Sequence, residues 1–370
     1  MISQVHSLDS HMLPSLDIVI VNWNAGWQLQ QCLDSIRTAS RDGVELLRVV
    51  VVDNASSDGS IDRLQPGSVP LSLIRNTVNR GFAAACNQGA RDSRASYLLF
   101  LNPDIVLTGE SLSATVRFME SGQNSKVAVC GVQLLNGPGQ IAPSCSRFPT
   151  PQHFYAKTFG LNHLSPRRFQ ESLMCDWNHH ETRPVDIVMG AFLLVRQEIF
   201  ATLGGFDEDF FVYYEEVDFL YKVHRRGWQS YYLTTAQAYH NGGGCSNQAK
   251  AARLFYSLRS RIIYCHKHFG WAHTASVVLA TLLIEPFSRM AYATARDGGR
   301  EIGDTLRAYA MLLKWLGAFM FKQDRLAPGS LNKNPSARDL TVPRNRPWNA
   351  DLAPDVAEAG THTEAAIDPS

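Results

Sequence analysis

The chain has 370 residues, of which 45% are hydrophobic and 19% charged, and its 35 basic and 34 acidic side chains leave a formal charge of +1. This is the composition of a globular protein, so a chain that is disordered over most of its length is excluded. The near-zero charge excludes a polybasic nucleic-acid-binding protein, and we expect no nucleic-acid partner. The length suits one large domain with an appendage, or two moderate domains.

The seven cysteines are scattered, and no two of them form a Cys-x-x-Cys pair. Their spacing argues against a disulfide framework or a zinc module and favours a reducing compartment. Residues 1–16 contain no continuous apolar core and do not match a secretory signal. The longest uncharged apolar run, Trp271 to Ile284, is shorter than the ~20 residues of a membrane-spanning helix. We therefore expect a cytoplasmic protein, either soluble or peripheral on the inner face of the plasma membrane.

The first hundred residues alternate β-branched runs with helical patterns, which indicates a parallel sheet with crossover helices. The expected elements are strands at 17–22, 47–53, 71–75 and 97–101, and helices at 27–38 and 81–90. Ligands of such sheets bind beyond the carboxyl ends of the strands. Polar residues that end or follow these strands should therefore converge on one edge, and they are Asn22, Asp53, Asn102 and Asp104.

The second part of the chain is less regular. After a strand and turn over 127–140, residues 143–183 are rich in Pro, His and aromatic residues, so we expect an irregular binding loop or lid there. Regular apolar pattern resumes over 185–195 and leads into a helix that ends at Leu203. A later helix ends near Arg226, before a final run that reaches His240.

Residues 249–325 are expected to be helical throughout, and their twelve Lys/Arg against five Asp/Glu give a local charge of +7, which leaves −6 for the rest of the chain. The last of these helices is expected to present one apolar stripe, made of Leu306, Tyr309, Ala310, Leu313, Leu316 and Met320. From 326 to 370 no periodicity survives, and we expect a disordered tail.

Two acidic sites follow predicted strands. Asp53 follows four consecutive valines at the end of a predicted strand, where its carboxylate can accept hydrogen bonds from a ligand or can cap the following turn. Asp104 lies in an Asn-Pro-Asp sequence that suits a divalent cation bridging phosphates but is also a common turn. No glycine-rich dinucleotide or P-loop motif follows the early strands, which argues against oxidoreductases and P-loop enzymes.

Three carboxylates, Glu215, Glu216 and Asp218, follow a group of aromatic residues. Repulsion among them and the aromatic surroundings would raise a pKa toward that of a general base, whereas the alternative is the solvated first turn of a helix. His240 is open to two interpretations, a metal ligand at a strand end or a buried, hydrogen-bonded imidazole.

Six short motifs in chain order resemble those of family 2 glycosyltransferases, most of all the rhamnosyltransferase-like branch. They are VIVNWN at 19–24, VVDNASSDGS at 51–60, NRGFAAACNQG at 79–89, LFLNPD at 99–104, GGFDEDFF at 204–211 and YEEVD at 214–218. The resemblance covers about residues 17–270. It implies a GT-A fold, a mixed α/β sheet with flanking helices, and inverting transfer of a sugar from a nucleotide-diphosphate donor to an acceptor hydroxyl.

The resemblance also implies roles for individual residues. Asp104 and His240 would bind a divalent cation, Mg²⁺ or Mn²⁺, and Glu216 would be the catalytic base, with Glu215 the alternative because this chain has Glu-Glu where the family usually has Glu-Asp or Asp-Asp. Asp218 is the third acid of this motif. The expected donor-binding residues are Asn22, Asp53, Arg80, Asn87, Asn102 and Gly190.

The expected organisation is an N-terminal extension at 1–16, a GT-A domain at 17–248, a basic helical region at 249–325 and the tail. The expected donor is dTDP- or UDP-linked, with rhamnose as the first choice of sugar, and the expected acceptor is a glycan or a polyprenyl-linked glycan of cell-surface polysaccharide assembly. The basic helices suggest contact with an anionic membrane surface or, alternatively, packing on the domain or on a second subunit. Two other functions stay open, a sugar-phosphate nucleotidyltransferase and a non-catalytic sugar- or lipid-binding scaffold.

Overall fold

The computed structural model describes residues 13–165, 168–169, 171–240, 250–297, 299 and 301–324. The chain divides into compact units of residues 1–322 and 323–370, and nearly all described residues belong to the first. The predicted tail at 326–370 and most of the predicted N-terminal extension lie outside the described residues, as does the predicted boundary at 248.

The strands begin at Ser15, two residues before the predicted start of the domain. They are β1 Ser15–Asn22, β2 Glu45–Asp53, β3 Leu71–Arg75, β4 Tyr97–Leu101, β5 Ile105–Leu107, β6 Val127–Leu135, β7 Cys145–Ser146, β8 Arg183–Val185, β9 Ile187–Val188, β10 Phe192–Arg196 and β11 Gln229–His240.

The helices alternate with these strands and then continue alone. They are α1 Trp27–Thr38, α2 Phe82–Ala90, α3 Ser111–Glu120, the 3₁₀ turn η1 Gly122–Asn124, α4 Pro151–Thr158, α5 Leu161–Leu164, α6 Gln197–Thr202, α7 Glu215–Arg225, α8 Lys250–His268, α9 Trp271–Leu283, α10 Glu285–Asp297 and α11 Ile302–Asp324.

Within the described residues, nine strands form one mixed sheet in the order β3-β2-β1-β4-β10-β6-β11-β5, with β8 paired to β11. The strands β3, β2, β1 and β4 are parallel, as predicted, and β10 runs antiparallel to both β4 and β6. Both faces of the central strands are buried, because alternate residues such as Ile18 and Val19 pack into separate cores on the two sides. The predicted mixed α/β sheet with flanking helices is confirmed.

One prediction for the middle of the chain is wrong. Residues 143–183 are not irregular throughout, because Thr150 caps α4 through its side chain and Pro151 occupies the first helical position. The regular pattern predicted over 185–195 corresponds to the end of β8 and to β9 and β10, with a turn at Met189 to Ala191. The prediction also missed β5 and α3.

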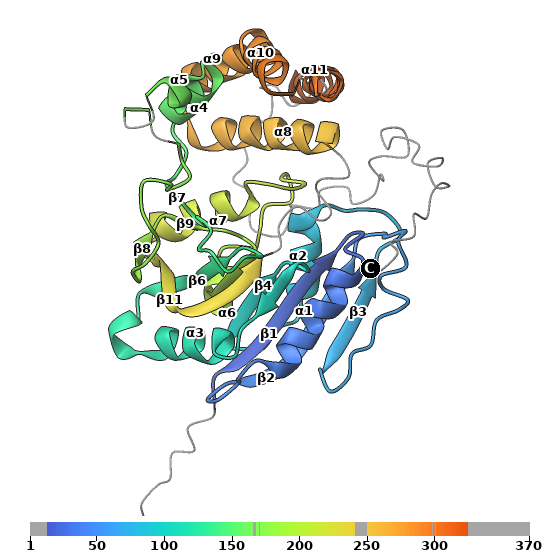
Figure 1. The fold of residues 1–370 in the computed structure, drawn as a ribbon, viewed down its shortest axis with the longest axis vertical. Helices are drawn as coiled ribbons and strands as arrows, with labels where there is room; N and C mark the ends of the chain where they lie inside the picture. Colours follow the sequence, from blue (N-terminus) through green and yellow to red (C-terminus); the bar gives the residue numbers. More distant parts are fainter. Residues whose placement is uncertain are drawn as a thin grey trace, which may run out of the picture. The chain divides into compact units, whose positions relative to one another are not determined.

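The predicted C-terminal helical region is present, and Figure 1 shows α8 lying between the sheet and the helices α9, α10 and α11. The predicted stripe of α11 is only partly right, because Tyr309 and Leu316 are buried while Leu306, Ala310 and Leu313 are exposed; the side chain of Met320 lies outside the described residues. The face that packs on the protein instead consists of Ala308, Tyr309, Leu312, Trp315 and Leu316. The residues of this packing face still follow the helical repeat, but the face is rotated about the axis of α11 toward α8 and away from the predicted face.

The loop between α6 and α7, residues 203–214, packs closely on α2. The Phe82 amide donates a 2.6 Å hydrogen bond to the Phe211 carbonyl. Gly81 has φ +86°, and a Cβ atom at this position would stand 2.4 Å from the same carbonyl oxygen. Close approach of this loop to α2 therefore requires glycine at position 81 for two reasons, backbone conformation and space.

We predict that Gly81→Ala lowers the free energy of unfolding by about 2 kcal/mol or more, because the new methyl group adds a steric clash to the cost of a left-handed backbone. Gly43→Ala is the matched control, since Gly43 has φ +77° and nothing within 4 Å of its would-be Cβ atom. The control should lose only about 1–2 kcal/mol. Urea denaturation of the two variants makes the comparison, and equal losses would contradict the close-approach argument.

Candidate functional site

The carboxyl ends of β1 and β2 are joined by the side chain of Asn22. Its amide nitrogen lies 2.9 Å from Asp53 Oδ1 and 3.0 Å from each of the hydroxyls of Ser56 and Ser60. The register of the two parallel strands places Asn22 directly beside Asp53. The amide oxygen of Asn22 is buried without a hydrogen-bond partner in the described residues. Asn22 thus keeps one unpartnered oxygen beside the buried Asp53 carboxylate at this edge of the sheet.

The loops that follow β1 and β2 hold each other in place. The Gly26 amide donates to Asp58 Oδ2 over 2.7 Å, and the Ser57 amide donates to Asn24 Oδ1 over 2.8 Å. Burial would raise the pKa of Asp58, but hydrogen bonds from Ser60 and from the Gly26 amide outweigh it and lower that pKa. Asp58 is therefore an ionised support for the first loop, a role that the sequence did not identify.

Arg80 lies at the same edge, in the connection between β3 and α2. Its amide donates to Asn54 Oδ1 over 3.2 Å, and the Asn54 amide nitrogen donates to the Gly81 carbonyl over 3.0 Å. Asn54 is buried, whereas the side chain of Arg80 is exposed. The structure thus fixes the Arg80 backbone and leaves its guanidinium accessible to a ligand.

Asp104 and His240 come together at the far side of the edge. Antiparallel pairing of β5 with β11 sets His240 opposite Ile105, next to Asp104. His240 Nε2 lies 3.4 Å from Asp104 Oδ2, while Asp104 Oδ1 is buried and lacks a hydrogen-bond partner in the described residues. The predicted pairing of these two residues is present.

This pair suits a divalent cation. A carboxylate with an orphaned buried oxygen and an imidazole nitrogen supply one hard and one borderline donor, which Mn²⁺ accepts readily and Mg²⁺ can accept through oxygen. Among the described residues, no three His, Cys, Asp or Glu side chains gather as a metal site. A cation held by Asp104 and His240 would therefore take further ligands from a bound donor or from water.

A short stretch of chain connects this pair to the acids of α7. The Asn102 amide donates a 2.9 Å hydrogen bond to the Ala191 carbonyl. The preceding residue, Gly190, lies against Glu216, and a Cβ atom there would stand 3.6 Å from Glu216 Cγ. Gly190 and Ala191 therefore bridge Glu216 and the Asn-Pro-Asp sequence.

Glu215 and Glu216 occupy different environments. Glu215 is buried, and burial followed by the charge of Glu216 raises its pKa well above the ordinary range. Glu216 is half-buried, and burial raises its pKa as well. One oxygen of each carboxylate lacks a hydrogen-bond partner among the described residues. The buried Glu215 therefore favours the protonated form, and Glu216 is the more exposed of the two acids.

The backbone just before these acids is strained. Tyr213 and Tyr214 have φ values of 68° and 71°, in a left-handed region that bulky residues rarely adopt. Each such residue costs about 1–3 kcal/mol and persists only where its surroundings impose the conformation. Tyr214 is the N-cap of α7, so this strained turn sets the direction in which the side chains of Glu215 and Glu216 project from α7.

Asp218 differs from the prediction that it belongs to the catalytic acids. Its carboxylate is fully buried and lies 2.7 Å from His268 Nε2, 2.5 Å from Lys222 Nζ and 3.2 Å from Lys267 Nζ. Burial would raise the pKa of Asp218, but hydrogen bonds from His268 and Lys222 outweigh it and lower that pKa to about 2. Asp218 is therefore an ion-pair partner of the end of α8, and its lowered pKa favours the ionised form.

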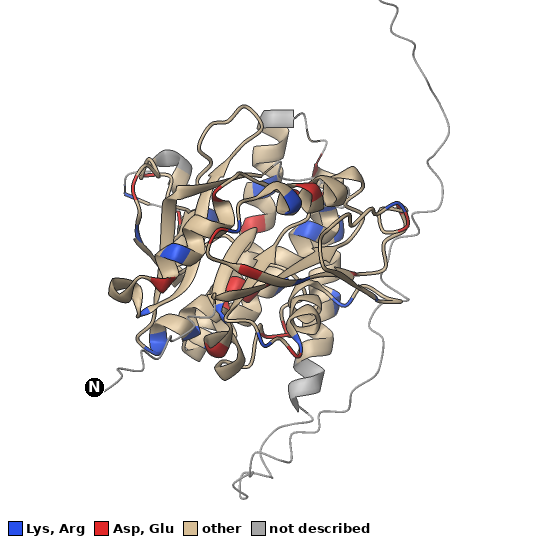
Figure 2. Ribbon diagram, turned by 90° about the horizontal axis from the view of Figure 1, so that it is seen from below, with Lys and Arg blue, Asp and Glu red and all other residues tan. Residues whose placement is uncertain are grey.

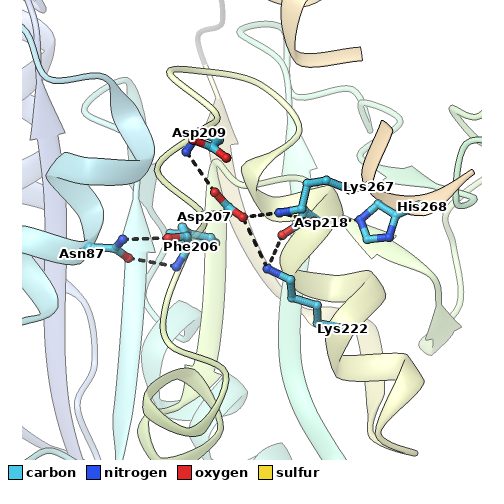
Figure 3. Close-up of polar contacts among 8 residues, drawn as sticks. All are labelled: Asn87, Phe206, Asp207, Asp209, Asp218, Lys222, Lys267 and His268. Atoms are coloured by element: carbon cyan, nitrogen blue, oxygen red, sulfur yellow. Dashed lines mark hydrogen bonds and ion pairs between the residues drawn. The ribbon is translucent and has the colours of Figure 1, made fainter. Parts of the chain in front are cut away.

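Asn87 also departs from its predicted role at the nucleotide. Its amide nitrogen donates to the Phe206 carbonyl over 2.7 Å, and its amide oxygen accepts from the Phe206 amide over 2.9 Å (Figure 3). Both polar groups of Asn87 are thus engaged by the loop before α7. Sequence reasoning missed this loop's supports, and the positions of Gly81 and Gly205 on either side of the contact were the available signal.

Curated relatives are all distant. An N-acetylglucosaminyl-diphospho-decaprenol L-rhamnosyltransferase of Mycobacterium tuberculosis is 24% identical over 286 residues, which cover 70% of this chain and 87% of that protein. The low-salt glycan biosynthesis hexosyltransferase Agl10 of Haloferax volcanii is 26% identical, covering 62% and 68%. Rhamnosyltransferase WbbL of Escherichia coli is 28% identical over 40% of this chain and 54% of its own length.

Among solved structures, mannosyltransferase PcManGT of Pyrobaculum calidifontis, in complex with GDP-Man and Mn²⁺, has a TM-score of 0.46 at 18% identity and covers 85% of this chain and 83% of its own. TarS 1–349 of S. aureus, in complex with UDP-GlcNAc, has a TM-score of 0.46 at 13% identity, covering 80% and 79%. The family model for glycosyl transferase family 2 matches residues 17–169, which include β1 to β6. Residues 17–169 of this chain are therefore a glycosyl transferase family 2 domain.

Proposed function

We propose that this enzyme transfers a sugar, with rhamnose as the first choice, from a dTDP- or UDP-linked donor to a hydroxyl of a lipid-linked glycan, with Glu216 as the general base. The observation that carries the proposal is the chain connection at Gly190 and Ala191, which joins Glu216 to the Asn102–Asp104 sequence. The names of two relatives support rhamnose, and one of these names also specifies a diphospho-decaprenol acceptor.

The reaction moves an electron pair to the leaving group and a proton to the base. The acceptor oxygen attacks the anomeric carbon of the sugar while the bond to the diphosphate breaks, and that bond's electron pair leaves with the diphosphate. Glu216 takes the acceptor proton as the new C–O bond forms. Because the acceptor attacks from the face opposite the leaving group, the anomeric centre is inverted. Asn22, Asp53 and Arg80 are suited to bind and orient the nucleotide part of the donor.

A sugar-phosphate nucleotidyltransferase and a non-catalytic scaffold were the alternatives from sequence. The family assignment favours glycosyl transfer over the first. A half-buried Glu216 with an unpartnered oxygen, a raised pKa and a glycine beside it is the arrangement of a reactive acid and not of a structural one, which argues against the second.

We expect Glu216→Gln to lower kcat by ~10²–10⁴-fold while donor binding survives, because the amide cannot take a proton. Glu215→Gln is the matched control and should keep most of the activity. Because the base must be ionised and burial raises the pKa of Glu216, the acid limb of the wild-type kcat/KM profile should lie above the ~4.3 of an ordinary glutamate. Steady-state kinetics across pH measures both effects. Full turnover by Glu216→Gln would overturn the assignment of the base.

Asp104 and His240 are the residues that would hold a divalent cation, and Asn102 can contribute only a neutral carbonyl. When bound there, the cation would stabilise negative charge on the diphosphate leaving group. The 3.4 Å separation of the two side chains and the orphaned Asp104 oxygen support this part of the proposal.

We expect Asp104→Ala and His240→Ala each to weaken Mn²⁺ binding measured in the presence of UDP, by ~10-fold or more, because each removes one protein ligand. Asp42→Ala, at an exposed position, is the control and should bind Mn²⁺ as the wild type does. Titration calorimetry or the electron paramagnetic resonance of Mn²⁺ reports binding directly. Unchanged Mn²⁺ affinity in both site variants would remove the metal from the proposal.

A lipid-linked acceptor places the enzyme at a membrane, and the inner face of the plasma membrane is the proposed location. No single helix of the described residues is long and apolar enough to cross a bilayer, and α9 with α10 pass that test only as a bent pair. Exposed apolar residues occur at every fourth position along these two helices. They are Trp271, Ala275, Leu279, Leu283 and Phe287, and we call them the 271–287 stripe. The exposed fractions of Leu279, Leu283 and Phe287 are 56%, 63% and 66%.

The basic side chains of residues 250–319 contribute less to attraction by an anionic membrane than their number suggests. Five of the eight basic side chains described between residues 250 and 319 form ion pairs, and these five are Lys250, Arg261, Lys267, Arg289 and Arg307. Figure 2 shows Lys and Arg interspersed with Asp and Glu over the ribbon. Binding to a bilayer would therefore depend on the apolar 271–287 stripe more than on the predicted charge of +7.

We expect the protein to float with liposomes that contain phosphatidylglycerol at both low and high salt. Leu283→Glu with Phe287→Glu should abolish flotation, because each large apolar side chain contributes about 1.5–3 kcal/mol when fully buried. Leu73→Glu, at an exposed position of the edge strand β3, is the control and should float. No flotation of the wild type at either salt, or equal flotation of the double variant, would contradict the membrane proposal.

A further inference from the structure

A cluster of five charged or ionisable side chains lies outside the donor and metal residues described above. Asp218 and Lys222 belong to α7, Lys267 and His268 end α8, and Asp207 comes from the loop between α6 and α7 (Figure 3). Lys267 contacts both Asp207 and Asp218, and Lys222 lies 3.9 Å from Asp207 Oδ2. Two carboxylates therefore face two ammonium groups in this cluster.

Helix α8 contacts the same loop at further points along its length. The Ser260 hydroxyl donates to the Val212 carbonyl over 2.8 Å, and Arg259 Nη2 donates to the Asp209 carbonyl over 3.2 Å. The rings of Tyr256 and Phe211 are stacked with centroids 4.4 Å apart. One face of α8 therefore follows the loop from Asp207 to Val212.

The other side of this loop is held by α2. Asn87 makes the paired hydrogen bonds with Phe206, and Phe82 donates to the Phe211 carbonyl. Gly205 has φ +76°, and a Cβ atom there would stand 2.6 Å from Asn87 Oδ1. The loop 203–214 thus lies between α2 and α8, and it ends at the strained Tyr213 and Tyr214 that precede Glu216.

We propose that Lys267 and Asp218 are positioning residues, which fix the loop 203–214 against α2 and thereby hold Glu216 where it meets the acceptor. This inference rests on the proposed function. Helix α8 and Glu216 both lie beyond residues 17–169, the part that the family model matches, and it is the structure that brings them together. Helix α8 is then a support of the candidate active site and not an appendage.

Lys267→Met removes the ammonium that joins Asp207 and Asp218, so the base should lose its alignment while donor binding stays intact. We expect kcat to fall by ~10–100-fold with the donor KM unchanged within about threefold, because small displacements of reacting groups have large effects on rate. Lys267→Arg should restore most of the kcat. Lys250→Met is the matched control, since Lys250 is on the same helix and pairs with Glu301. Its kcat should equal that of the wild type.

Asn87→Ala tests the same loop from the α2 side. It replaces Lys267→Met as the test if circular dichroism shows that Lys267→Met is not folded. A positioning role predicts a lower kcat with unchanged donor KM, whereas the nucleotide-binding role predicted from sequence requires a higher donor KM. Two results with an active wild type would show that the positioning inference is wrong. In the first, Lys267→Met and Asn87→Ala have the same kcat and donor KM as Lys250→Met. In the second, they raise the donor KM and leave kcat unchanged. If the wild type turns over no dTDP- or UDP-sugar, the proposed function fails instead.

Discussion

The loop 203–214 is the constraint on which the candidate active site depends. Its chain must run close to α2, which glycine at positions 81 and 205 allows, and it must then turn through two tyrosines in left-handed conformations. Such a turn is unfavourable by itself, so the contacts on both sides have to impose it. Because Glu216, the proposed base, comes just after this turn, the contacts of the loop with α2 and α8 bear on where its side chain lies.

The sheet supplies the other half of the site through register. Parallel pairing of β1 and β2 sets Asn22 beside Asp53, and antiparallel pairing of β5 and β11 sets His240 next to Asp104. These residues are 31 and 136 positions apart in the sequence, yet each pair meets because strand ends converge on one edge. Gly190 and Ala191 then connect this edge to Glu216, so a donor bound at the sheet would face the base.

Much of this could be predicted from the sequence. The four consecutive valines of β2, the apolar β4 and the polar residues that end or follow these strands indicate the parallel half of the sheet and its ligand-binding edge. The roles of Asn87 and Asp218 could not be predicted, because their partners, Phe206 and the end of α8, are distant in sequence. The stripe of α11 was misjudged for a related reason: several apolar faces fit the helical repeat, and packing on α8 selects one of them.

Amide hydrogen exchange over residues 206–216 tests most directly whether α8 holds the base-bearing loop. Without any substrate, Lys267→Met should speed exchange in this loop by ~10-fold or more relative to the wild type, while exchange in β1 and β4 stays the same, since local opening depends on local contacts. Lys250→Met should exchange as the wild type does. Unchanged exchange of the loop in Lys267→Met would contradict the account, because the loop would then keep its conformation without the contact from α8.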